Sequence, residues 1–174
     1  MTGHRAKRAG LVFALAVVIT AGAAAETIDR VLAVVAGQLI MLSDVTAVRD
    51  LGVLPAGASG DPTGAVLTRL IDRELMLVEV DRYAPPEPES AEIDREVAAI
   101  RARMPGKTFD DILTRSGFDL THVREIVRQN LRLKAYLDQR FTVPDGDETR
   151  RQTLVDEWVT GLRRRTPVVN LYQK

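Results

Sequence analysis

Few side chains in this sequence could carry out acid–base or nucleophilic chemistry. The chain has no cysteine and two histidines, His4 and His122. The lack of cysteine excludes disulfides, thiol nucleophiles and cysteine-based metal sites. His4 lies in a segment that we expect to be removed, and one remaining histidine cannot build a multi-histidine metal site or a two-histidine acid–base pair. We therefore expect no catalytic residue, no metal and no cofactor, and we interpret His122 as an exposed surface residue.

Glu74 is the carboxylate with the most unexpected position. It falls near the middle of the apolar face of a helix predicted over about residues 63–83. A catalytic acid is one interpretation, but no second acid or base can be placed beside it. We favour the other interpretation, a partly buried carboxylate that is paired with an arginine.

Three arginines follow one another at intervals of four residues. Arg124, Arg128 and Arg132 share one side of a helix expected over about residues 119–140. Such a stripe could contact phosphate or an acidic partner, but we favour a solvated face because the chain is not basic overall. The glycines of residues 57–64 do not form a phosphate-binding loop, since no lysine or serine completes the P-loop pattern.

The elements that carry these residues are mostly helical. Apolar runs at residues 31–35 and 39–42, on either side of a glycine-containing break, predict a β-hairpin. Helical periodicity and end signals predict helices over about residues 44–49, 63–83, 91–104, 108–116, 119–140 and 148–164, and a terminal strand over 168–172. We expect a mostly α fold with a small β-sheet.

The N-terminal residues have the three-part pattern of a secretory signal peptide. Basic residues precede the apolar run 11–19, and small residues end in Ala23-Ala24-Ala25. The apolar run is shorter than the roughly 20 residues that a membrane-spanning helix needs. We predict a signal peptide over residues 1–25 that is cleaved near Ala25–Glu26, export to the periplasm, and no stable membrane insertion afterwards. An uncleaved membrane anchor is the alternative.

The mature chain would be one domain of modest negative charge. Residues 26–174 number 149, which is the size of an ordinary domain with a real core. The leader carries three of the 24 basic residues and none of the 24 acidic ones, so the remainder has a net charge near −3. This charge gives no reason to expect a nucleic-acid partner.

The order of elements is similar to that of a known family. Residues 28–44, IDRVLAVVAGQLIMLSD, resemble the start of mature SurA-type periplasmic chaperones, where a hairpin of the form V-D-x-V-x-A-V-V-x-x-x-x-I-x-x-S-D-V follows the signal peptide. Residues 67–79 resemble the family's next helix, 108–141 its paired helices, and 153–172 its C-terminal piece. The resemblance implies a helical chaperone domain whose N-terminal hairpin pairs antiparallel with the C-terminal strand, with residues 148–172 completing the domain.

One departure from the family limits what the resemblance implies. SurA-type proteins usually carry one or two parvulin isomerase domains before the last helix, but only about ten residues, 141–150, occupy that place here. The family's isomerase site also uses histidines that this chain lacks. The resemblance therefore implies a chaperone-like protein without prolyl isomerase activity, which binds unfolded or extended polypeptides such as outer-membrane protein precursors. The alternatives are a non-catalytic envelope assembly or scaffold protein that binds one partner, through the arginine stripe for example, and a degenerate isomerase.

A chaperone needs an apolar surface that adapts to many sequences, which methionines and aromatic residues provide. Met76 and Val80 project off the main apolar face of their helix, which favours their exposure. Each candidate could equally belong to the core. The candidate peptide-binding residues are Met76, Val80, Met104, Phe109, Ile112 and Phe118.

Overall fold

The described part of the chain folds into helices around a small sheet. The structure is a computed structural model, which describes residues 29–54, 57–106, 108–144 and 147–173. The predicted signal peptide lies outside the described residues. The elements are β1 (Val31–Val35), β2 (Gln38–Met41), α1 (Leu42–Asp50), α2 (Pro62–Tyr83), α3 (Ser90–Ala102), α4 (Thr108–Ser116), α5 (Leu120–Arg140), α6 (Glu148–Arg165) and β3 (Val168–Asn170). The expected mostly α fold with a small antiparallel sheet is confirmed.

The sheet brings the N-terminal hairpin and the C-terminal strand together. Its strand order is β2-β1-β3, and both pairings are antiparallel. Val34 of β1 lies opposite Leu39 of β2 on one side and opposite Val169 of β3 on the other. The predicted pairing is therefore confirmed, although β3 ends at Asn170 instead of Tyr172. Both β2 and β3 are edge strands of this sheet.

A two-residue turn closes the hairpin. Ala36 and Gly37 have φ angles of 49° and 90°, and positive φ at both central residues is the signature of a type I′ turn. This turn matches the right-handed twist of the flanking strands. Gln38, which the sequence had placed in the break, therefore belongs to β2.

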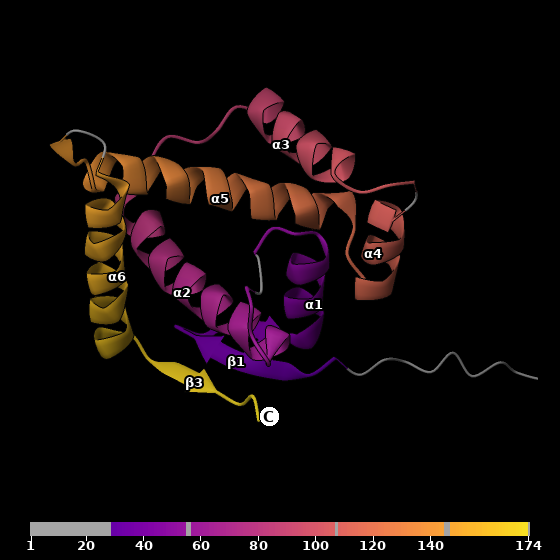
Figure 1. Cartoon of the computed structure of the whole chain (residues 1–174), viewed down its shortest axis with the longest axis horizontal. Coiled ribbons are helices and arrows are strands. Elements are labelled where there is room, and N and C mark those ends of the chain that lie inside the picture. Colours follow the sequence, from indigo (N-terminus) through magenta and orange to yellow (C-terminus); the bar gives the residue numbers. More distant parts are fainter. Residues whose placement is uncertain (1–28, 55–56, 107, 145–146, 174) are drawn as a thin grey trace, which may run out of the picture.

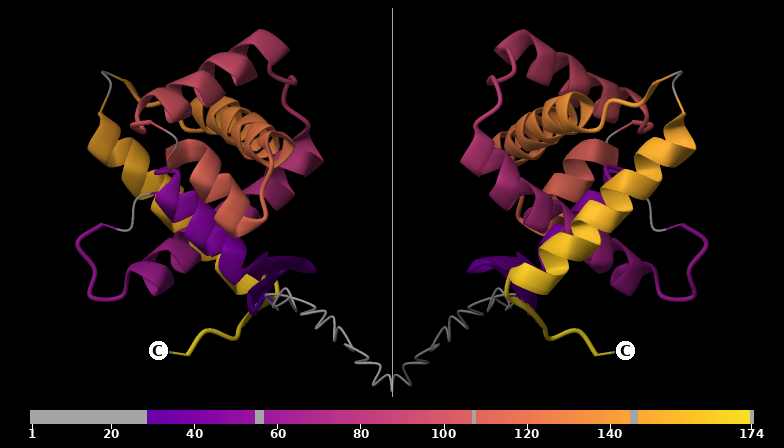
Figure 2. Two further views of the ribbon diagram at one scale, coloured as in Figure 1. Left: turned by 90° about the vertical axis from the view of Figure 1, so that its right-hand side faces the viewer. Right: turned by 90° about the vertical axis from the view of Figure 1, so that its left-hand side faces the viewer.

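The helices are stacked in layers on one face of the sheet (Figure 1). Helix α2 contacts β1 and β2 and also packs against α1, α5 and α6. Helix α5 crosses above α2, and α3 lies on the far side of α5, as both views of Figure 2 show. Helix α6 returns from the end of α5 to the sheet, where β3 begins. The opposite face of the sheet carries no helix in the described part of the chain.

The hydrophobic core falls into three groups of buried side chains. The first lies between the sheet and α1 and α2, and it includes Leu32 and Leu75. The second joins α1, α3, α4 and α5 around Phe109 and Val123. The third joins α2 to α5 and includes Val80. Helix α2 contributes to two of these groups, so it is the central support for the surfaces described below.

Candidate functional site

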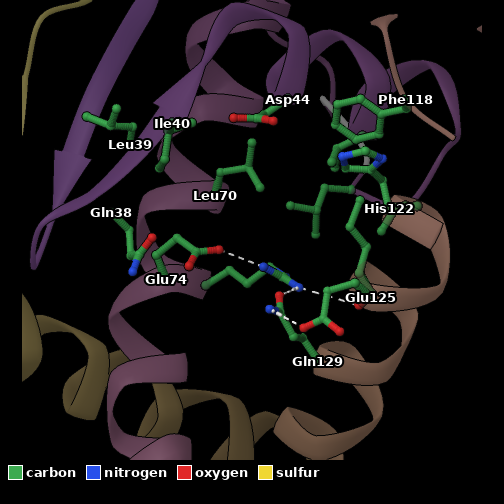
Figure 3. A pocket seen from close by; sticks show the side chains of 15 residues that line it. Gln38, Leu39, Ile40, Asp44, Leu70, Glu74, Phe118, His122, Glu125 and Gln129 are labelled. Atoms are coloured by element: carbon green, nitrogen blue, oxygen red, sulfur yellow. Dashed lines mark hydrogen bonds and ion pairs between the residues drawn. The ribbon is translucent and has the colours of Figure 1, made fainter. Parts of the chain in front are cut away.

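A pocket of about 240 Å³ lies between β2, α1, α2 and the first half of α5; we call it the β2 pocket (Figure 3). Residues 38–40 of β2 border it on one side, and Phe118 and residues of α5 border it on the other. Its charged lining residues are Asp44, Arg73, Glu74 and Glu125. Its apolar lining residues are Leu39, Ile40, Val48, Val53, Leu54, Leu70, Phe118 and Ile126.

Arg73 forms the part of the pocket wall that joins α2 to α5. The residue is 6% exposed, and its Nε and Nη2 donate to Asn130 Oδ1 and Gln129 Oε1, each at 2.8 Å. Its Nη1 lies 2.6 Å from Glu74 Oε1. The expected pairing of Glu74 with an arginine is therefore confirmed. Burial raises the pKa of Glu74, and the guanidinium of Arg73 opposes that increase.

Asp44 lies at the outer edge of β2, where its Oδ2 accepts the backbone N–H of Met41 at 2.7 Å. Backbone groups of an antiparallel strand point alternately toward and away from its partner. The next N–H, that of Leu42, donates to Arg30 O on the β1 side. Leu39, two positions before Met41, therefore turns its N–H and C=O toward the same outer edge as Met41. An edge strand that presents such groups can pair with another extended chain.

Leu39 also begins an apolar row on the face of the sheet without helices. Its side chain is 58% exposed, and that of Val169 is 52% exposed. Val34 pairs with both residues, and directly opposite residues have their side chains on the same face. The row Leu39, Val34 and Val169 thus crosses all three strands and reaches the β2 pocket at Leu39.

Phe118 and His122 lie together beside Asp44 in the pocket (Figure 3). Their rings are stacked, with centroids 5.1 Å apart. Asp119, between them in the chain, is the N-cap of α5, and its Oδ1 accepts the backbone N–H of His122 at 2.9 Å. Hydrogen bonds from the backbone and ring of His122 lower the pKa of Asp119. His122 is exposed, as predicted, but its place at the pocket was not predicted because the sequence does not bring α5 to β2.

A second and larger hollow of about 690 Å³, the α2–α6 cleft, lies on the other side of Arg73. Leu54 and Arg73 line both hollows, so they separate the cleft from the β2 pocket. An ion pair between Arg163 Nε and Asp72 Oδ1, 2.6 Å apart, belongs to the lining. The apolar lining residues of the cleft are Leu54, Met76, Leu133, Val155 and Val159.

The six predicted peptide-binding residues do not form one surface. Phe118 lines the β2 pocket, and Met76 lines the α2–α6 cleft. Val80 is 0% exposed, so its expected exposure is wrong; residues of α5 cover it. Phe109 and Ile112 are buried among α1, α3, α4 and α5, and Met104 is half-buried against the same group. These three therefore take the core role that the sequence left open.

The arginine stripe of α5 is not the solvated face that the sequence predicted. Arg132 is 8% exposed, and the stripe lies against α3 and the segment that joins α2 to α3. The prediction is wrong because acidic residues of α2, α3 and the segment between them pair with the arginines, which the pattern of a single helix cannot show. The ion pairs are Arg124–Asp94, Arg128–Glu87, Arg128–Glu125, Arg132–Asp81 and Arg132–Glu87.

Residues 29–54, 57–106, 108–144 and 147–173 contain no group of three His, Asp or Glu side chains that could hold a metal ion. None of the helices in this part of the chain has both the length and the apolar character needed to cross a membrane. No protein-family model matches the chain, and no curated protein sequence matches it.

Proposed function

We propose that this protein binds extended segments of unfolded polypeptides, as a chaperone-like protein of the periplasm without isomerase activity. The β2 pocket is the observation that carries the proposal. The backbone N–H and C=O of Leu39 point outward at the rim of a pocket that is lined by the apolar side chains of Ile40, Leu70 and Phe118. Main-chain hydrogen bonds to an added strand do not depend on the client's sequence, whereas a neighbouring pocket selects its side chains. This combination suits a protein that must accept many clients.

The size of the pocket indicates that binding is local and reversible. A volume of about 240 Å³ holds one or two side chains instead of a folded surface. Ordering an extended segment opposes binding, so a contact of this size gives modest affinity. The α2–α6 cleft offers the same client a second apolar contact, and the flexible thioether of Met76 can adapt to different side chains there.

The identity of the clients comes from the resemblance to SurA-type chaperones, which implies outer-membrane protein precursors. The alternative is an envelope scaffold that docks onto one partner through Arg124, Arg128 and Arg132. Each of these arginines is already paired with an acidic residue of its own chain. No other observation favours the scaffold, so we retain polypeptide binding as the proposal.

Suppression of aggregation tests this function directly. Protein expressed from the full-length chain should slow the aggregation of an unfolded outer-membrane porin when present in several-fold molar excess. Leu39→Asp should weaken that suppression several-fold, because it places a charge at the pocket and on the apolar row. Leu171→Asp is the matched control, since Leu171 is 53% exposed and does not line the pocket. No suppression by the wild type would overturn the proposal, and equal losses in both variants would remove the β2 pocket from it.

A prolyl isomerase assay tests the non-catalytic part of the proposal. A standard proline peptide should isomerise at its uncatalysed rate in the presence of the protein. Clear acceleration would overturn the non-catalytic part of the proposal.

A further inference from the structure

Asp44 differs from the other charged residues of the β2 pocket, because it forms no ion pair with any residue that the structure describes. Arg73 pairs with Glu74, and Glu125 pairs with Arg128. No Lys or Arg among the described residues lies within ion-pair distance of Asp44. Its known contact is the neutral N–H of Met41, which occupies one carboxylate oxygen. The pocket is therefore left with an unbalanced negative charge at the edge of β2.

A second carboxylate reinforces this charge. Asp29 accepts the backbone N–H of Ser43 at 3.1 Å through Oδ1, and its Oδ2 accepts the hydroxyl of Ser43. Burial raises the pKa of Asp44 and repulsion by the nearby Asp29 adds to that increase, while the Met41 N–H and His122 oppose it. A half-buried carboxylate in such surroundings is stabilised in its charged form by an incoming cation.

The same carboxylate lies where the side chains of an added strand would pass. Asp44 Oδ2 bonds to Met41 N–H, and Leu39 presents its own backbone groups two positions away on that edge. Residues two apart on a strand are separated by about 6.6 Å. A lysine or arginine side chain spans such a distance from a neighbouring position of the added strand. Its apolar stem would lie along Phe118 while its charged end reaches Asp44.

We infer that the extended segment bound at β2 carries a lysine or arginine, whose charged group pairs with Asp44 beside the apolar contact at Phe118. This inference rests on the proposed function and adds a preference to it. Negative segments are disfavoured, because they would approach the carboxylate of Asp44. Clients with alternating apolar and basic residues are thus preferred over equally apolar acidic ones.

Matched peptides separate the preference from binding itself. Fluorescently labelled ten-residue extended peptides that differ at one position, with lysine, acetyl-lysine or glutamate, are titrated with the full-length protein and followed by anisotropy. The lysine peptide should bind about tenfold more tightly than the acetyl-lysine peptide, the size of effect expected of a charge-assisted contact. The glutamate peptide should bind most weakly. Raising the salt concentration should weaken the lysine peptide most.

Asp44→Asn identifies the residue responsible, because the asparagine oxygen can still accept the Met41 N–H. In this variant the lysine preference should disappear, so that the lysine and acetyl-lysine peptides bind equally. Asp111→Asn makes the same change at an exposed aspartate of α4 that does not line the pocket, and it should keep the preference. Equal binding of the three peptides to the wild type would overturn the inference and leave the proposed function standing. Binding of none of them would overturn the proposed function, and loss of preference in both variants would overturn the assignment to Asp44.

Discussion

Arg73 bonds to Glu74 within α2 through Nη1 and, through Nε, to Asn130 of α5. The buried guanidinium of Arg73 thus pairs with the carboxylate of Glu74 and also connects α2 to α5, two helices that are far apart in the sequence. These hydrogen bonds of Arg73 lie between the β2 pocket and the α2–α6 cleft, and Arg73 lines both hollows. The shape of each hollow therefore depends on this side chain.

Arg73→Met should destabilise the protein while keeping a long flexible side chain at this place. We expect the free energy of unfolding to fall by about 3 kcal/mol, because Glu74 would lose its cation in a largely buried site. Urea denaturation followed by circular dichroism measures the change. Arg163→Met is the control: it breaks the more exposed pair with Asp72, which should change stability by about 1 kcal/mol or less. Equal losses in the two variants would contradict a structural role of Arg73 between α2 and α5.

The stability of Asp44→Asn should differ from that of the wild type in a pH-dependent manner. Burial, with help from Asp29, raises the pKa of Asp44 above its ordinary value of 3.8, although the Met41 N–H and the nearby His122 oppose this. The raised pKa means that the contribution of Asp44 to stability is fully present below 3.8 and is lost as the pH rises through the folded-state value. Asparagine has no such loss, so the variant should be more stable than the wild type at pH 7.

Denaturation at pH 7, 5.5 and 4 checks the sign of this effect. The advantage of Asp44→Asn should shrink as the pH falls, because the wild-type carboxyl then becomes protonated. An advantage that grows on acidification would show that Asp44 is stabilised in its charged form within the free protein. That result would also remove the reason for expecting a cation from the client.

Local patterns in the sequence were sufficient for the elements of the fold. Apolar periodicity gave α2 and α5 within a residue or two, because both helices carry apolar residues at helical spacing along their whole length. Gly37, between two apolar runs, was enough to predict the hairpin. A two-residue hairpin turn of this type requires positive φ angles, which glycine adopts readily. The pairing of β3 with β1 came only from the family resemblance, because strand partners far apart in the chain leave no local pattern.

The candidate site depended on contacts between elements, and there the sequence was less informative. Val80 was expected to be exposed because the helix pattern was judged without α5, which buries it. Arg132 was expected to be solvated because the acidic residues that pair with it lie on other segments. Leu39 and Asp44 were not proposed at all. They become a site only when β2 is known to be an edge strand that faces Phe118.

Leu162 should be the main anchor of the C-terminal segment. It is 1% exposed and is the one fully buried side chain of α6. Leu162→Ala should lower the free energy of unfolding by about 2–5 kcal/mol, the range for a large buried side chain cut back to alanine. Leu154→Ala, at a side chain that is 37% exposed, should change it by about 0.5 kcal/mol or less. Hydrogen exchange should show lower protection of the β3 amides in Leu162→Ala alone. Unchanged protection of β3 in that variant would contradict the role of Leu162 in holding the C-terminal strand in place.

Two alanines with left-handed backbone should be sites where the protein can be stabilised. Ala36 in the hairpin turn has φ 49°, and Ala84 at the end of α2 has φ 44°. For a residue with a Cβ, the left-handed conformation is unfavourable by about 1–2 kcal/mol. Asparagine adopts this conformation more readily than alanine, and glycine adopts it without the steric penalty because it has no Cβ. Ala36→Asn and Ala84→Gly should therefore each raise the free energy of unfolding by about 0.5–1 kcal/mol. Ala98→Gly, at an exposed position inside α3, is the opposite control and should lower it by about 1 kcal/mol. If all three changes destabilise the protein in urea denaturation, neither alanine is held in the strained conformation.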